Sequence, residues 1–220
     1  MKSAEKQTAL ALRAQGLSYN DILKETGVSK STLSLWLRDI PLTNEQIAQL
    51  ENKISAEREK FSRNERKRRD IRWGDYHLEA EEEYELLSLN PQFMFGLALY
   101  IGEGSKTNQN GLCLSNCDPR VICKGLEFFR AIGIPARSMR CAIHLHPGLC
   151  VNTAERYWQG VTGLASTNFQ KTTVALSQAS TSRKGNVQEY GTCHIKASHT
   201  KIRQKLSRWM ELVLDVGPLV

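Results

Sequence analysis

Residues 95–102 form an uncharged run, FGLALYIG, and this run constrains the fold more than any other part of the chain. Glu103 follows it directly, and Lys106 comes three residues later. An apolar run that ends on a polar residue and glycine predicts a buried helix over residues 91–103. A carboxylate at the C-terminal end of a helix opposes the helix dipole, which favours a functional role for Glu103. The alternative is a core helix whose last residue is merely exposed.

Charge is distributed unevenly along the chain. Residues 1–90 carry 15 Lys or Arg against 16 Asp or Glu, whereas residues 91–220 carry 15 against seven. A domain this basic attracts polyanions, so we expect a nucleic acid as its partner rather than a generic positive surface. No apolar run approaches the roughly 18 residues of a membrane span. The first residues carry no apolar stretch typical of a secretory signal, so we expect a cytoplasmic protein.

The six cysteines are then expected to be reduced thiols, and they form no CxxC pair. The nearest metal-like set lies between residues 141 and 150, where Cys141, His144, His146 and Cys150 follow one another. On a strand the two histidines share one face and Cys141 points to the other. We therefore expect a strand with mixed faces, and a zinc site is the alternative.

Residues 18–38 have the pattern of a helix-turn-helix. Ser18 and Ser29 are good N-caps of two short helices, and Gly27 allows the tight turn between them. The stretch resembles the helix-turn-helix of repressors, resolvases and sigma-like domains, which implies double-stranded DNA as the partner. A plain three-helix bundle is the alternative. The residues expected to contact DNA are Ser29, Lys30, Ser31, Thr32, Ser34 and Arg38.

The expected fold class is α+β, in three parts. An all-α helix-turn-helix domain covers residues 1–50, a charged helical connector covers residues 51–90, and an αβ domain with an antiparallel sheet covers residues 91–216. The elements of the last part are expected to be helices over 91–103, 119–132, 152–161 and 199–214 and strands over 111–116, 137–145, 169–178 and 189–197.

The connector is polar along its whole length, and its charge changes sign near Gly74. Its first part is basic and its second part is acidic. We expect one long helix or a helix pair, whose basic stretch contacts phosphates or whose halves attract each other. The alternative is a solvated helix stabilised by ion pairs between side chains four residues apart.

The helix over residues 95–104 resembles the motif helix of LAGLIDADG homing endonucleases, and residues 91–214 resemble a single-motif version of that fold. The resemblance implies that Glu103 is the terminal acid of the motif and a ligand of Mg²⁺. Ala98 and Gly102 fall on its small residues, which implies that two such helices pack together in a homodimer through residues 93–104. Two features depart from the pattern, because the acid is Glu rather than Asp and because Ile101 stands where the motif has another acid.

The resemblance also implies further site residues. Lys106 and Lys196 would act beside Glu103 as catalytic cations that stabilise charge on the phosphate. The sheet of this fold lies on DNA, which implies DNA contacts at Arg137, Arg140, Lys171 and Lys196 and at the loop residues Arg183 and Lys184. Asp118 precedes a proline and is expected to cap a helix instead of acting in catalysis.

Two functions remain open at this point. One is a metal-dependent DNA endonuclease that uses its helix-turn-helix for targeting. The other is a transcription regulator that uses the same two domains only to bind DNA. A serine recombinase is disfavoured, because the helix-turn-helix is N-terminal and no nucleophile-and-arginine cluster stands out.

Overall fold

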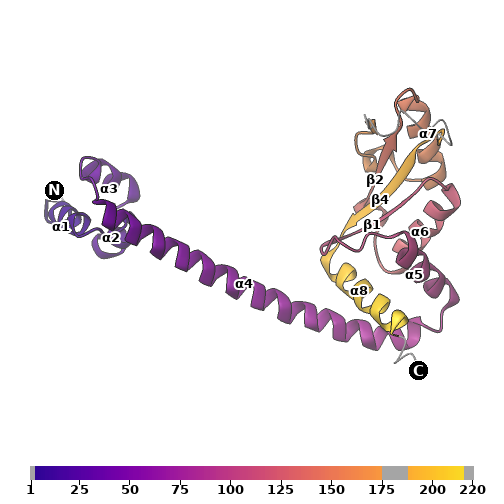
Figure 1. Cartoon of the computed structure of the whole chain (residues 1–220), viewed down its shortest axis with the longest axis horizontal. Coiled ribbons are helices and arrows are strands. Elements are labelled where there is room, and N and C mark those ends of the chain that lie inside the picture. Colours follow the sequence, from indigo (N-terminus) through magenta and orange to yellow (C-terminus); the bar gives the residue numbers. More distant parts are fainter. Residues whose placement is uncertain (1–2, 175–187, 216–220) are drawn as a thin grey trace. The chain divides into compact units, whose positions relative to one another are not determined.

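The computed structural model describes residues 3–174 and 188–215, and the chain divides into two compact units, residues 1–70 and 71–220 (Figure 1). The first unit is all-helical. Its elements are α1 (Ser3–Ala14), α2 (Tyr19–Thr26), α3 (Lys30–Leu37) and the first part of α4 (Asn44–Leu87). Its core consists of Ala9, Ile22, Val28, Leu33 and Leu37.

The ends of these helices are set by the capping residues that the sequence predicts. The Ser18 and Ser29 hydroxyls accept hydrogen bonds from the amides of Asp21 and Thr32, and Gly27 has a φ of 64° at the end of α2. Gly27 therefore adopts the left-handed conformation that favours glycine. These caps confirm the predicted helix-turn-helix geometry.

Helix α4 is one continuous helix, so of the two predicted arrangements the single helix is correct. It begins with a capping box, in which the Gln46 amide donates to Thr43 Oγ1 at 3.2 Å and Gln46 Oε1 accepts from the Thr43 amide at 3.0 Å. Every residue from 51 to 64 is exposed. Neither α4 nor any other described helix combines the length and apolarity that would let it cross a membrane.

The second unit joins the end of α4 to an αβ domain. Its helices are α5 (Pro91–Glu103), α6 (Pro119–Ala131), α7 (Val151–Thr162) and α8 (Thr200–Leu214), with short 3-10 turns at Ala136–Ser138 and Ser166–Asn168. Its strands are β1 (Gly111–Asn116), β2 (Met139–Leu145), β3 (Thr173–Val174) and β4 (Thr192–Ser198), in the order β1-β4-β2-β3.

The sheet is mixed, so the prediction of an antiparallel sheet is wrong for one of its pairs. Strand β4 pairs antiparallel with β1 and β2, but β2 pairs parallel with β3. The cause is the connection, because α7 lies between β2 and β3 and a helical crossover returns the chain in the same direction. The strand predicted over residues 169–178 is described only at Thr173–Val174, and residues 175–187 lie outside the described part.

Helices cover one face of the sheet. On that face the strands bury alternate side chains, among them Leu112 and Leu114 of β1, Cys141 and Ile143 of β2, and Ile195 of β4. They join the core cluster of the second unit with residues of α5, α6, α7 and α8. The described helices contribute to the core on this face, and the other face of the sheet, which carries the alternate side chains, is called the open face below.

Helix α5 packs closely on α6 through Gly96. A Cβ atom at Gly96 would lie 2.3 to 2.7 Å from atoms of the Phe128 side chain. Ala98 and Gly102, which the sequence assigns to packing between two copies of this helix, are exposed, and a Cβ atom at Gly102 would meet nothing within 4 Å. Within one chain, Gly96 is therefore the residue that brings two helices together.

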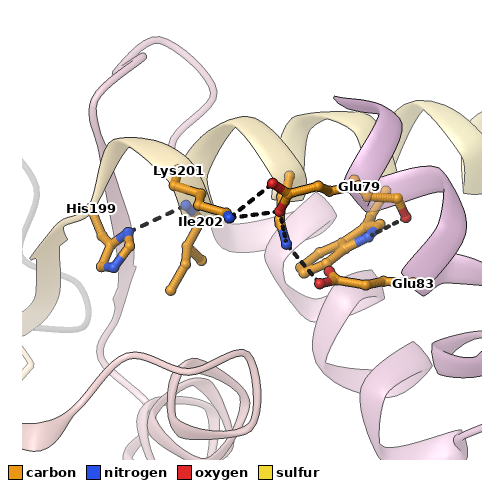
Figure 2. Close-up of polar contacts among 8 residues, drawn as sticks. Glu79, Glu83, His199, Lys201 and Ile202 are labelled. Atoms are coloured by element: carbon orange, nitrogen blue, oxygen red, sulfur yellow. Dashed lines mark hydrogen bonds and ion pairs between the residues drawn. The ribbon is translucent and has the colours of Figure 1, made fainter. Parts of the chain in front are cut away.

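The acidic end of α4 is fixed to α8 by ion pairs and one buried aromatic contact. Lys201 points to Glu79 in Figure 2, with Nζ 2.6 Å from Oε2. Lys205, whose side chain is 10% exposed, lies 2.8 Å from Glu79 and 2.6 Å from Glu83. The Trp209 indole donates to the Ala80 carbonyl at 3.0 Å. The acidic half of the connector thus belongs to the fold of the second unit.

Candidate nucleic-acid interface

Helix α3 presents one exposed face that fits the major groove of DNA. Ser31, Ser34, Leu35 and Arg38 are exposed and follow one another at helical spacing, while Leu33 and Leu37 are buried on the opposite side. In a helix-turn-helix this second helix lies in the groove and its side chains contact base edges. The α3 face thus has hydroxyls at its centre and cations at its ends.

The six residues of this unit that were predicted to contact DNA differ in their exposure and in their hydrogen bonds. Lys30, Ser31, Ser34 and Arg38 are exposed. The Ser29 hydroxyl is occupied as the N-cap and also lies 2.9 Å from the Thr32 hydroxyl, so these two side chains first stabilise the start of the helix.

Leu35 is a residue that the sequence reasoning missed. Its side chain is 63% exposed at the middle of the α3 face. An apolar side chain in the major groove can contact the methyl group of thymine. The signal was present in the sequence, because Leu35 lies between the two buried leucines of α3 and cannot share their face.

The open face of the sheet forms a second polar and basic surface. It carries Cys113, Ser115, Arg140, Ala142, His144, Thr192, His194 and Lys196, and none of these strand positions is acidic. The register places Arg140 directly opposite Lys196. Two predicted DNA contacts from different strands are thus neighbours, and the Arg140 guanidinium is held by the carbonyls of Arg137 and Met139 at 2.8 and 2.9 Å.

His194 lies at the centre of the open face. Its Nδ1 atom is 2.6 Å from Ser115 Oγ, and its ring lies 4.1 Å from the ring of His144 between centroids. Its Nε2 atom is enclosed and has no partner in the described part of the chain. Burial, together with the nearby His144 and Lys196, lowers the pKa of His194 to about 4. His194 is therefore neutral at physiological pH.

The remaining predicted sheet contacts are scattered. Arg137 and Lys171 are exposed but lie outside the strands, in the turns before β2 and β3. Arg183 and Lys184 lie outside the described residues.

The segment that follows Glu103 is held firmly against β1 and α8. The Ser105 amide donates to the Cys113 carbonyl at 2.8 Å, and the Tyr100 hydroxyl donates to the Ser105 carbonyl at 3.0 Å. From α8, the buried Arg203 donates to the carbonyls of Lys106 and Asn108 at 3.0 and 2.8 Å. The turn is therefore rigid, since its backbone carbonyls have protein partners on two sides.

Glu103 itself is exposed at the end of α5 and has no hydrogen bond or ion pair with any described residue. The exposed side of α5 also carries Phe95, Ala98 and Gly102, which with Glu103 form one stripe at helical spacing. Lys106 is exposed as well, with its ammonium 3.5 Å from the Gly102 carbonyl. Lys196 lies opposite Cys113, whose carbonyl binds the turn, so Lys196 and this turn flank the same part of β1.

Metal ligands do not gather in a single copy of this chain. Across residues 3–174 and 188–215, no group of three His, Cys, Asp or Glu side chains could hold a metal ion. In the set weighed as an alternative zinc site, Cys141 is buried in the core while His144 lies on the open face, as expected for a strand with mixed faces. A single exposed carboxylate suits a hard cation such as Mg²⁺ but supplies only part of its ligands.

Asp118 has the structural role that the sequence predicts. It caps α6, accepting from the Arg120 amide at 2.8 Å, and pairs with the Arg120 guanidinium at 2.6 Å. The hydrogen bonds from Arg120 lower the pKa of Asp118 to about 2.

Comparison with known families agrees with the helix-turn-helix geometry. The family described as a homeodomain-like domain matches residues 1–40. No curated protein and no solved structure matches the chain. Residues 1–40 therefore form a homeodomain-like helix-turn-helix domain, which suggests DNA binding.

Proposed function

We propose that this protein binds duplex DNA sequence-specifically through two surfaces, the exposed face of α3 and the open face of the sheet. The observation that carries the proposal is the α3 face, where Ser31, Ser34, Leu35 and Arg38 are exposed together on a homeodomain-like domain. Hydroxyls and an apolar side chain can distinguish bases, and Lys30 and Arg38 suit phosphates. The open face supports the proposal with adjacent cations and no acidic strand position.

The test is a binding titration with a duplex selected from a randomised pool. The double variant Lys30→Glu/Arg38→Glu is expected to weaken binding by at least about tenfold at moderate salt, since phosphate contacts dominate affinity. Its matched control is Lys124→Glu/Arg130→Glu on α6, which makes the same change of charge at two exposed positions that belong to neither surface. Equal affinities for the two variants would contradict the assignment.

A metal-dependent endonuclease of LAGLIDADG type is a second candidate, and one observation favours it. The α5 stripe of Phe95, Ala98, Gly102 and Glu103 is exposed, and at Gly102 there is open space where a side chain would stand. A second copy that packed along this stripe would bring two Glu103 carboxylates together.

In such a homodimer the two Glu103 side chains would hold Mg²⁺, whose chemistry is to activate water toward a phosphodiester. Lys106 and Lys196 would neutralise charge on the phosphate, because both are cations that flank the same part of β1. The rigid turn after α5 would keep these groups in place without the cost of ordering a loop.

Plasmid cleavage separates the two candidates. The protein is incubated with plasmid and Mg²⁺ or Mn²⁺, beside a Glu103→Gln variant and a Glu127→Gln control on α6. Cleavage that requires metal, survives in the control and is lost in Glu103→Gln supports the endonuclease. Tight binding without any cleavage supports a transcription regulator instead. A protein that sediments as a monomer and still cleaves DNA at full rate would contradict a metal site shared between two Glu103 side chains.

A further inference from the structure

Helix α4 carries a stripe of six apolar and four polar residues, and most of the apolar ones are exposed. Its residues alternate in spacing between three and four, the pattern of a coiled coil, and this α4 seam consists of Ile47, Leu50, Ile54, Glu57, Phe61, Asn64, Arg68, Ile71, Asp75 and Leu78. Five of its six apolar members are exposed, with Phe61 at 68% and Ile71 at 69%, and Leu50 is half-buried. A helix that is exposed on all sides over residues 51–64 has no packing of its own there to stabilise it.

We propose that the α4 seam is the interface of an antiparallel coiled coil with a second copy of this chain. In antiparallel pairs the layers of the seam join residues from opposite ends of the two helices. The register that sets Ile54 opposite Ile71 of the second copy also sets Ile47 opposite Leu78. These four apolar side chains then cover one another, which removes their surface from water, whereas the same register sets Leu50 opposite Asp75 and Phe61 opposite Asn64.

Charges in the same register are complementary. Glu57 lies opposite Arg68 of the second copy, inside the seam, and Arg58 lies beside Glu65 at its edge. Glu65 and Arg68 already pair within one helix at 2.9 Å, so two copies join their charges into a network of alternating sign. The symmetry of the pair repeats this network on the other side of its centre.

The flanks of the register agree with this arrangement. Glu51 lies beside Arg72 of the second copy, which adds a further attractive pair. Lys60 lies beside Lys67 of the second copy, and this like-charge pair weakens the proposed register. Charges at seam edges set the orientation of a coiled coil.

A parallel pair in register would be unfavourable. Each seam residue would then face its own counterpart, so Glu57, Arg68 and Asp75 would each meet a like charge. Like charges brought together at an interface disfavour that arrangement. The distribution of charge therefore selects the antiparallel pair and explains why polar residues interrupt the seam.

The contacts between α4 and α8 leave the C-terminal end of the seam free. The contacts that fix its acidic end to α8 use Glu79, Ala80 and Glu83, while Leu78 between them is 61% exposed. Near its start, Lys53 pairs with Asp21 of α2 at 2.8 Å, yet Ile47 and Ile54 stay exposed. At this end the seam borders α2, because Leu50, Ile54 and Glu57 line a hollow with Asp21 and Lys24 of α2, so the second copy would pack beside α2 there.

Charge reversal of the intact protein, free of DNA, tests the proposal by sedimentation equilibrium. Glu57→Arg and Arg68→Glu are each expected to raise the dimer dissociation constant by at least about tenfold, because each sets like charges opposite one another. The double variant Glu57→Arg/Arg68→Glu restores the attraction with inverted sign. The matched control is Glu59→Arg, which makes the same change of charge on the side of α4 away from the seam.

All variants are also measured in an Ala98→Glu background, which removes the α5 stripe as a source of association. A monomeric wild-type chain at high concentration would overturn the proposal. The proposal would also be overturned if the single variants had the same dimer dissociation constant as Glu59→Arg. A double variant that dimerises no more tightly than the single variants would overturn it as well. Circular dichroism checks that the exposed substitutions leave the helix content unchanged.

Discussion

His194 illustrates how a single side chain is held in one protonation state by the face on which it lies. The Ser115 hydroxyl occupies one ring nitrogen, and the other is enclosed without a partner. A proton added there would be a buried charge next to His144 and Lys196, which is unfavourable. The open face therefore offers a neutral polar ring at its centre and cations at one end.

The titration of His194 predicts a loss of stability in mild acid. Its pKa falls from an ordinary value of 6.5 to about 4, so between these pH values the unfolded chain binds a proton that the folded chain does not. The free energy of unfolding should therefore decrease as the pH falls from 6.5 to 4, by about 1 kcal/mol after allowance for the partial exposure of the ring. Denaturant titrations across this range measure it.

The variant His194→Gln isolates this contribution, because glutamine keeps a polar side chain but does not titrate. The variant should lose less stability than the wild type over the same range of pH. Parallel curves for the two proteins would show that His194 is not the responsible group.

At the scale of elements, the packing of α5 on α6 depends on one missing side chain. Substitution Gly96→Ala should destabilise the second unit by about 1–3 kcal/mol, because the added methyl would overlap Phe128, including its Cβ atom. Gly102→Ala is the matched control, since it adds the same methyl to the same helix where nothing lies within 4 Å. Thermal unfolding of both variants would measure the difference, and equal melting temperatures would contradict this account of the packing.

Elements set by local chemistry could be predicted from the sequence. The caps at Ser18 and Ser29 and the turn at Gly27 all depend on residues within a few positions of one another, and all of them were found. The same holds for Asp118 at the start of α6.

Features set by long-range contacts could not be predicted. The burial of Arg203 depends on a turn about a hundred residues earlier in the chain, whose carbonyls it satisfies. The parallel pairing of β3 depends on where α7 returns the chain, and hydrophobic alternation carries no information about strand direction. The role of Gly96 in the packing of α5 on α6 was not predicted, because the sequence does not show which small residue of a helix meets a bulky side chain such as Phe128.

At the scale of the whole molecule, two surfaces in separate units suit the same polyanion. If both contact DNA, their contributions to the salt dependence of binding should add. Arg140→Ala/Lys196→Ala should therefore reduce the slope of log affinity against log salt by about two, since each phosphate contact contributes about 0.9. The control Lys124→Ala/Arg130→Ala on α6 should leave the slope unchanged. Identical slopes for the two variants would remove the open face from the binding surface.

The double engagement of Gln46 decides how short an autonomous DNA-binding fragment can be. Its side chain caps α4 and also donates from Nε2 to the Ala14 carbonyl at the end of α1, at 2.9 Å. Lys53 adds an ion pair to α2. A peptide cut at residue 40, where the match to the homeodomain-like family stops, would lose both supports and leave a helix end bare. A stable DNA-binding fragment therefore needs to extend beyond Lys53, so that it keeps the contacts of Gln46 with Ala14 and of Lys53 with Asp21.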